Sequence, residues 1–295
     1  MRRLIQIHRK RGFTCVELMM VIAIITLLAA ILLPAISNAR ETARRSMCRN
    51  NMMQIGLALH NYHDAHRLFP PGTVNSQGPV REDKPGQGFS WIARILPFLE
   101  KGQLFRSLDF HLPADDPKNL KNAQRTPAIL GCPSSSRVAN CYVGVHHHQE
   151  APIDVDNTGV LFLNSSIRYD DIPDGRRSTL LIGEAGDAGS WSMGTRATLR
   201  NASPMFTQDQ LQELFDKQPD YYRSPDPLPV PDAKREDASA QTDPTLRVGS
   251  FSSQHLGGCN FVLCDGSLKF LSPRMDQTTF QRLAHRSDGN LIRDF

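Results

Sequence analysis

The stretch RGFTCVELMMVIAIITLLAAILLP, residues 11–34, decides the architecture of this chain. Between Leu18 and Leu33 its only polar residue is Thr26, and the flanking residues extend the apolar run to the roughly 20 residues that a spanning helix needs. Five Lys and Arg residues precede it, and such a basic flank stays in the cytoplasm. The sequence therefore predicts a transmembrane segment over residues 13–36, with the rest of the chain outside the cytoplasm.

A single carboxylate, Glu17, lies near the start of this segment, and three ordinary interpretations leave it unexplained. A cleaved signal peptide would end its apolar core at a small-residue cleavage site, and no compelling site follows here. A lipoprotein would place its apolar region before Cys15, not after it. A plain uncleaved anchor tolerates the acid but gives it no role.

The hexapeptide Gly12-Phe13-Thr14-Cys15-Val16-Glu17 resembles the class III signal of type IV pilins and type II secretion pseudopilins. The resemblance implies that a prepilin peptidase removes a leader, residues 1–12, by cutting between Gly12 and Phe13, and that Phe13 is then N-methylated. It also implies that Glu17, the fifth residue of the mature chain, acts in subunit assembly. The sequence departs from the family at Cys15, where leucine is usual.

Removal of the leader changes the meaning of the charge. The formal net charge of +4 includes the five basic leader residues, so the mature chain carries about −1. No basic patch interleaved with aromatic residues is present, and we expect no nucleic acid as a partner.

The helical pattern continues beyond the apolar segment, over residues 37–66. Apolar residues recur there at three- and four-residue spacing, which predicts the stripe of an amphipathic helix. The stripe consists of Ile36, Ala39, Ala43, Met47, Met52, Ile55, Leu59 and Tyr62. At 1.5 Å per residue the whole helix would be about 70 Å long, and the FPPG sequence at Phe69–Gly72 would end it.

Residues 67–295 predict an extracytoplasmic head with short strands among loops. SWIARILPFLE, residues 90–100, reads as a helix broken near Pro97, and the apolar stretches at 158–164 and 178–184 read as buried strands. The region 201–250 combines a candidate helix, TQDQLQELFDK, with a proline- and charge-rich stretch. Such a composition cannot bury enough surface to fold alone and predicts a mobile insertion.

The stretch SSQHLGGCNFVLCDGSLKFLS, residues 252–272, predicts a β-hairpin. Asp265-Gly266 between apolar strands is the typical sequence of a type I′ turn, in which both central residues have positive φ. A short closing helix should follow, with Asp276 as its N-cap.

This stretch carries a second resemblance. His255, nine residues and then Asp265-Gly266 match the carboxy-terminal H-x9-DG motif of a bacterial pilin-like family of unknown function, the DUF1559 proteins. Residues 44–72 and the sequence DIPDGRRSTLLIGEAG resemble other parts of the same family. The resemblance supports the fold and the export route and implies no established activity.

Several histidine and carboxylate side chains are of the types that bind metal ions. His60, His63, Asp64 and His66 could bind a metal, but a junction between helix and head favours hydrogen bonding. His146, His147 and His148 are predicted to lie in a loop, where adjacent side chains point in different directions. DVDNTG, residues 154–159, begins like a calcium loop but lacks the fifth-position and bidentate ligands. We therefore expect no metal or other cofactor.

His255 and Asp265 could act as an acid–base pair, but no nucleophile elbow, P-loop or dinucleotide motif accompanies them. The simpler interpretation is that Asp265 makes the turn and His255 hydrogen-bonds the loop before it. In an exported head the six cysteines could include disulfides, and Cys132 and Cys141, across a short loop, are the candidate pair.

The sequence thus predicts an α+β, pilin-like protein: a long amino-terminal helix packed on an antiparallel β-sheet head. The predicted function is structural and not enzymatic, as a subunit or minor component of a type IV pilus or type II secretion pseudopilus. Its expected partners are a prepilin peptidase, other pilin-like subunits and the cytoplasmic membrane. The alternative is a membrane-anchored extracytoplasmic binding protein that does not polymerise.

Overall fold

The computed structural model describes residues 15–135, 139–205, 243–255, 257–290, 292 and 295. The chain forms two compact units, Met1–Arg44 and Arg45–Phe295, and each is described by itself. The expected processing residues Gly12 and Phe13 lie outside the described residues, as does most of the expected insertion at 201–250 with its candidate helix.

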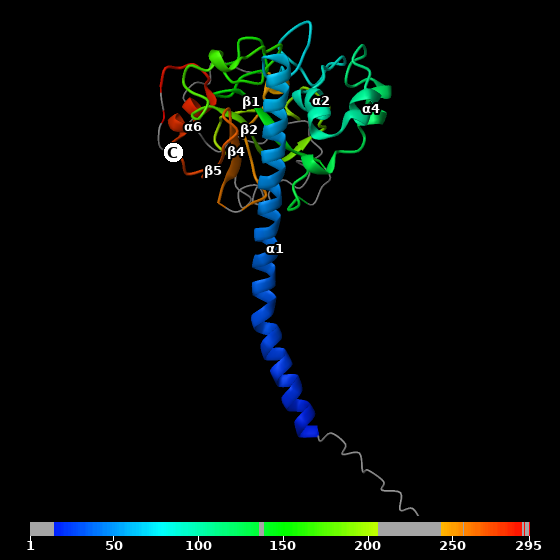
Figure 1. The fold of residues 1–295 in the computed structure, drawn as a ribbon, viewed down its shortest axis with the longest axis vertical. Coiled ribbons are helices and arrows are strands. Elements are labelled where there is room, and N and C mark those ends of the chain that lie inside the picture. Colours follow the sequence, from blue (N-terminus) through cyan, green and yellow to red (C-terminus); the bar gives the residue numbers. More distant parts are fainter. Residues whose placement is uncertain (1–14, 136–138, 206–242, 256, 291, 293–294) are drawn as a thin grey trace, which may run out of the picture. The chain divides into compact units, whose positions relative to one another are not determined.

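One helix, α1, runs from Cys15 to His66 over 52 residues, which confirms the predicted long helix (Figure 1). Its Cys15–Leu33 part has a mean hydropathy of 2.8 and none of it is buried. Within the described residues this is the one helix long and apolar enough to cross a membrane. The helix ends where Arg67 adopts a left-handed φ of 62° and Pro70 and Pro71 follow.

The head contains a five-stranded sheet in the order β3-β1-β2-β4-β5. The strands are β1 (Asn140–His147), β2 (Leu180–Gly189), β3 (Leu199–Asn201), β4 (Cys259–Leu263) and β5 (Leu268–Leu271). The pairs β1–β2, β2–β4 and β4–β5 are antiparallel, as predicted. The edge strand β3 instead runs parallel to β1, so the sheet is antiparallel except at that edge.

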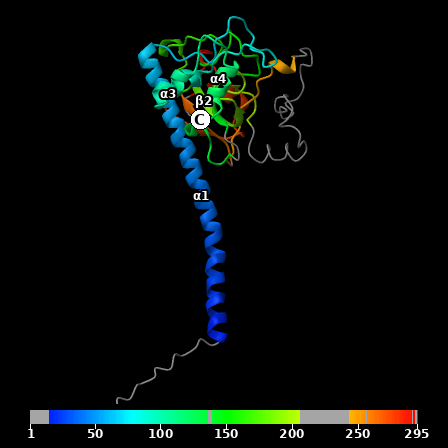
Figure 2. The same cartoon turned by 90° about the vertical axis from the view of Figure 1, so that its right-hand side faces the viewer.

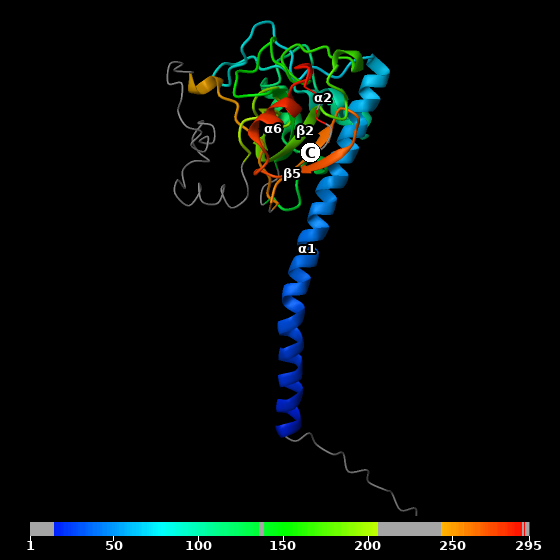
Figure 3. The same ribbon diagram turned by 90° about the vertical axis from the view of Figure 1, so that its left-hand side faces the viewer.

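Both faces of the sheet are covered. One face contributes Tyr142 and Val262 to a core shared with α1, and the other packs Val143 and Phe261 against the closing helix α6 (Gln277–Ala284). Figure 3 shows α6 and the head-side turns of α1 on opposite sides of the sheet. Asp276 caps α6, because its carboxylate accepts the backbone N–H of Thr279 at 2.8 Å, as predicted.

The rest of the head consists of short helices and loops. Figure 2 shows α3 beside the head-side turns of α1. The short elements are α2 (Trp91–Ile95), η1 (Leu96–Leu99), α3 (Gly102–Ser107), α4 (Pro117–Ala123), η2 (Ala128–Leu130), η3 (Tyr169–Asp171) and η5 (Pro244–Leu246). The predicted break near Pro97 is confirmed, since α2 gives way there to the 3-10 turn η1.

On its head side α1 buries the second half of the predicted stripe. Met52, Ile55 and Leu59 are fully buried in the core. Gly56 lies so close to β4 that an added Cβ would be 3.0 Å from the side chain of Val262. The first half of the predicted stripe is exposed: Ile36, Ala39, Ala43 and Met47, of which Met47 is 55% exposed. Next to Met47 the buried stripe passes through Cys48 instead.

Two predictions in the middle of the head are wrong. His146 and His147 belong to strand β1 and not to a loop. The stretch at residues 158–164 is buried but irregular, with a single bridge from Leu163 to Thr73. Its backbone N–H groups bind carbonyls of β1, as Val160 and Leu161 do with Val145 at 3.2 and 3.1 Å.

The predicted hairpin is confirmed but its turn type is wrong. Gly266 has a φ of 84°, whereas Asp265 does not have positive φ, so the turn is not type I′. The N–H of Gly266 binds the carbonyl of Leu263, and the N–H of Leu263 binds the carbonyl of Ser267, both at 2.9 Å. This is a three-residue loop, a type I turn closed by a glycine in the left-handed region.

Candidate functional site

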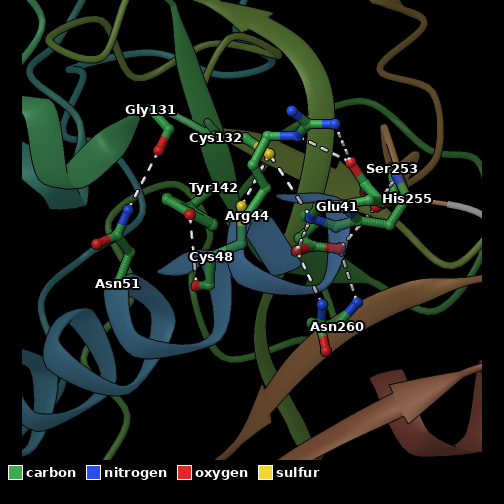
Figure 4. Close-up of polar contacts among 11 residues, drawn as sticks. Glu41, Arg44, Cys48, Asn51, Gly131, Cys132, Tyr142, Ser253, His255 and Asn260 are labelled. Carbon is green, nitrogen blue, oxygen red and sulfur yellow. Dashed lines mark hydrogen bonds and ion pairs between the residues drawn. The ribbon is translucent and has the colours of Figure 1, made fainter. Parts of the chain in front are cut away.

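Two cysteines and a histidine meet beneath the head-side part of α1 (Figure 4). Cys48 lies on α1, Cys132 follows η2, and His255 precedes β4. The thiol of Cys48 donates to the sulfur of Cys132 at 2.8 Å, and Nε2 of His255 lies 3.6 Å from that same sulfur. Cys48 and His255 have no exposed surface, whereas Cys132 is half-buried. In the part of the chain that the structure describes, this is the one group of three such donors close enough for a single metal ion.

A buried carboxylate completes the cluster. Glu184, on β2, is 4% exposed, and its Oε1 lies 3.9 Å from Nε2 of His255. Its oxygens accept the backbone N–H and side-chain amide of Asn260 at 2.9 and 3.0 Å, and the hydroxyl of Ser253 at 2.8 Å. Burial raises the pKa of Glu184, and these hydrogen bonds and His255 offset part of the rise.

The pKa values of the two thiols are shifted in opposite directions. The hydrogen bond from Cys48 lowers the pKa of Cys132, and His255 lowers it further. The same contact and burial raise the pKa of Cys48. These opposite shifts make Cys132 the more acidic thiol of the pair, and its sulfur faces the imidazole of His255.

The pairing expected for Cys132 is not the one that the structure brings together. Cys132 and Cys141 are not joined by a disulfide, and the sulfur of Cys132 contacts that of Cys48. The sulfur of Cys141 instead lies 3.6 Å from the carbonyl of Ala139. Loop spacing could not indicate this contact, because it joins positions 84 residues apart.

Asp265 and His255 contact different groups. The Asp265 carboxylate accepts the backbone N–H and hydroxyl of Ser267 at 2.8 and 2.6 Å, so it supports the hairpin turn. The imidazole of His255 contacts Cys132 and Glu184. Sequence reasoning missed Glu184, and its signal was a carboxylate within an otherwise apolar strand, which requires buried partners.

The histidines near the end of α1 pack against Tyr169. Nδ1 of His60 lies 2.6 Å from the hydroxyl of Tyr169, and the ring of His63 stacks on the same tyrosine with centroids 3.5 Å apart. Burial lowers the pKa of both histidines. Asp64 and His66 are exposed, so these four residues do not converge on one point.

The histidines of β1 hold the loop that follows the strand. His146 is fully buried, and its Nδ1 lies 2.9 Å from Oδ1 of Asn157. That oxygen also accepts the backbone N–H of Asp154 at 2.9 Å. Thr158 binds Nδ1 of both His147 and His148, at 3.2 and 2.8 Å. In the stretch that resembled a calcium loop, side-chain oxygens of Asp154, Asn157 and Thr158 thus take part in the protein's own hydrogen bonds.

A separate cleft of about 710 Å³ opens beside the last turns of α1. Several aromatic residues contribute to its lining, and Arg94 contributes a cation. The aromatic lining residues are Tyr62, Phe89, Phe98, Phe105 and Phe110.

The amino-terminal unit presents its own feature. Glu17 lies in the first turn of α1, and the residues that follow it expose their apolar side chains, among them Leu27 at 64% and Ile31 at 64%. The apolar helix and a prepilin-type motif together fit a membrane-anchored protein.

Comparisons with known proteins give one match at the amino-terminal segment and a second match over most of the head. Residues 7–33 match the prokaryotic N-terminal methylation motif, and residues 37–278 match a family described as protein of unknown function (DUF1559). No curated protein and no solved structure matches the chain. Neither match brings a catalytic activity. Because the second match spans most of the chain, this is a member of the DUF1559 family that carries a prepilin-type methylation motif.

Proposed function

We propose that this chain is a structural subunit or minor component of a filament of the type IV pilus or type II secretion pseudopilus kind, and that it is not an enzyme. The observation that carries the proposal is the methylation motif at residues 7–33, which includes the apolar helical segment Cys15–Leu33, none of which is buried. An apolar surface of that length needs lipid or other protein around it.

On this proposal, a prepilin peptidase removes residues 1–12, residues 13–36 span the cytoplasmic membrane, and residues 37–66 lead into an extracytoplasmic head, 67–295. The basic leader keeps the amino terminus in the cytoplasm before cleavage. Cleavage between Gly12 and Phe13 exchanges that cluster of charges for a single methylated amine on Phe13.

After cleavage, the Glu17 carboxylate needs an opposite charge within the membrane. A carboxylate at the centre of a membrane helix costs about 2.5–3.5 kcal/mol, and less near the interface. In a filament the Glu17 carboxylate of one subunit neutralises the Phe13 amine of its neighbour, which offsets part of the desolvation of both charges. This pairing sets the register between neighbouring helices.

The test is incorporation of Glu17→Val into filaments, measured by shear fractionation against the wild type in the same cells. We expect the variant to insert, fold and be cleaved, and to be absent from the sheared filaments. Glu41→Gln, at an acid on the same helix beyond the apolar segment, is the matched control and should assemble normally. Normal assembly of Glu17→Val, or an intact Met1 terminus by mass spectrometry in cells with a prepilin peptidase, contradicts the proposal.

The aromatic cleft favours a second candidate, an anchored extracytoplasmic binding protein that does not polymerise. Its apolar walls and the Arg94 guanidinium suit a ligand with an apolar body and an acidic group. This candidate would be favoured if the wild-type protein is absent from sheared filaments and Glu17→Val does not change how the protein fractionates.

A further inference from the structure

The contact between Cys48 and Cys132 is held from both sides. On the helix, the side-chain amide of Asn51 donates to the carbonyl of Gly131, the residue before Cys132, at 3.2 Å. From the sheet, the hydroxyl of Tyr142 lies 3.5 Å from the carbonyl of Cys48. The two sulfurs therefore meet because the backbones that carry them are fixed, and not through side-chain flexibility alone.

We propose that Cys48 and Cys132 form a disulfide that ties α1 to the head, and that His255 is the positioning residue that keeps Cys132 as the attacking thiolate. The proposal rests on export of the head, because disulfides form and persist in oxidising compartments outside the cytoplasm. It gives the histidine of the H-x9-DG motif a chemical role.

The roles of the two cysteines follow from their surroundings. Cys132 is half-buried and can be reached from solvent, whereas Cys48 is fully buried. Nε2 of His255 faces the Cys132 sulfur, and the carboxylate of Glu184 faces the same nitrogen. A thiolate is the nucleophile in disulfide exchange, and a neighbouring imidazolium stabilises it.

The oxidant is an extracytoplasmic dithiol protein in its disulfide form. The Cys132 thiolate attacks one sulfur of that disulfide, the S–S bond of the oxidant breaks, and its second sulfur leaves as a thiolate. Cys48 then loses its proton to this leaving thiolate and attacks the sulfur of Cys132. This attack expels the oxidant's first sulfur, the one bonded to Cys132, as a thiolate. Cys48 and Cys132 end as a disulfide, and the oxidant ends reduced, with one sulfur as a thiol and the other as a thiolate that takes a proton from water.

The same donors could be considered a zinc site, but two features favour the disulfide. Thiolates bound to one tetrahedral zinc ion at about 2.3 Å lie roughly 3.8 Å apart. The sulfurs here are 2.8 Å apart. The fourth donor, Glu184, already accepts three hydrogen bonds within the protein.

The first experiment uses the full chain in detergent, equilibrated in glutathione redox buffers and then alkylated after denaturation. We expect two of the six thiols to be protected under oxidising conditions, and peptide mapping of the wild type to show a Cys48–Cys132 cross-link. Cys48→Ser and Cys132→Ser should each abolish protection, and Cys141→Ser, the matched control, should retain it. Six alkylated thiols under oxidising conditions, or a cross-link to Cys141, overturn the proposal.

The second experiment measures the role of His255 by the pH dependence of Cys132 alkylation by iodoacetamide in the Cys48→Ser chain. We expect His255→Gln to move the midpoint to higher pH and to slow alkylation at pH 7 by a factor of at least about three. An unchanged pH profile overturns the role assigned to His255.

Zinc alone, added to the reduced full chain, provides the opposing outcome. Stoichiometric uptake that is lost in both Cys48→Ser and His255→Gln would overturn the disulfide in favour of a metal site. Because all three measurements use purified protein, failure of filament assembly leaves them unaffected, and the two proposals can fail separately.

Discussion

The two ends of helix α1 use apolar residues in different ways. From Cys15 to Leu33 apolar side chains surround the helix and remain exposed, whereas from Cys48 to His63 they form one stripe that the head buries. A helix that is apolar all round requires an apolar environment, and a helix with one apolar stripe requires one packed face. The first end therefore depends on surroundings outside the chain, and the second on contacts within the head.

The largest expected effect separates two methionines near the boundary between these ends. Met52 is fully buried and Met47 is 55% exposed. Met52→Ala should lower the free energy of unfolding of the head by about 2–5 kcal/mol, because it removes core contacts and leaves a cavity. Met47→Ala should change it by less than about 0.5 kcal/mol. Chemical denaturation of the full chain in detergent measures both, and equal effects would break the comparison.

The next effect is a pH dependence that arises within the head. Burial lowers the pKa of His146 to about 3, so the folded head keeps this imidazole neutral while the unfolded chain protonates it near pH 6.5. A depressed folded-state pKa gives stability that is present above the unfolded pKa and is lost as the pH falls below it. Between pH 7 and pH 5 we expect a loss of about 2 kcal/mol.

His146→Asn tests this assignment. Asparagine retains a donor near the position of Nδ1, which faces Asn157, but does not titrate. Its unfolding free energy should fall less between pH 7 and pH 5 than that of the wild type. The same slope in both proteins would place the pH dependence elsewhere.

A smaller effect tests the contact between the hairpin and α1. At Gly266 an added Cβ would meet Nε2 of His60 at 3.1 Å, and φ is 84°. Gly266→Ala should cost about 1–2 kcal/mol. Gly289→Ala is the matched control, since φ is 78° there and no atom lies within 4 Å of the added Cβ. If Gly266→Ala lowers the Tm more than Gly289→Ala does, the difference measures the contact with His60. Equal decreases would mean that backbone strain alone accounts for the effect at Gly266.

The smallest effect concerns an ion pair in the amino-terminal unit. Glu41 and Arg44 lie 2.7 Å apart, with both side chains partly exposed. Exposed pairs one turn apart contribute little, so Glu41→Gln should change the free energy of unfolding by less than about 0.5 kcal/mol. A change above 1 kcal/mol by calorimetry would show that this unit holds more of the folding energy than the comparison allows.

Local signals predicted the elements that depend on neighbours in sequence. The long helix, the hairpin of β4 and β5, and the cap at Asp276 follow from periodicity, turn residues and capping chemistry. Strand β1 was missed because its sequence, NCYVGVHH, contains buried polar residues whose partners lie outside the strand: Asn157 for His146 and Ala197 for Asn140. Residues 158–164 look like a strand in isolation, but their N–H groups bind β1 without forming a regular ladder.

The candidate site was less predictable for the same reason. His255 was identified by its motif, but its partners Cys132 and Glu184 come from segments far away in the sequence. Cys48 was hidden within the helical stripe, where a buried cysteine looks like any small apolar residue. Only the fold shows that these four side chains meet.

The order of the strands sets when the head can finish folding. Strand β2 pairs with β4, which is synthesised some 70 residues later, and β4 also carries Val262 against Gly56 of α1. Pairing of such distant segments is slow, and synthesis adds about 5–20 residues per second. On the proposed export route the chain therefore stays loose enough to cross the membrane until nearly all of it has emerged. A chain that ends before His255 lacks strand β4, which packs against α1, and also lacks the imidazole that faces Cys132.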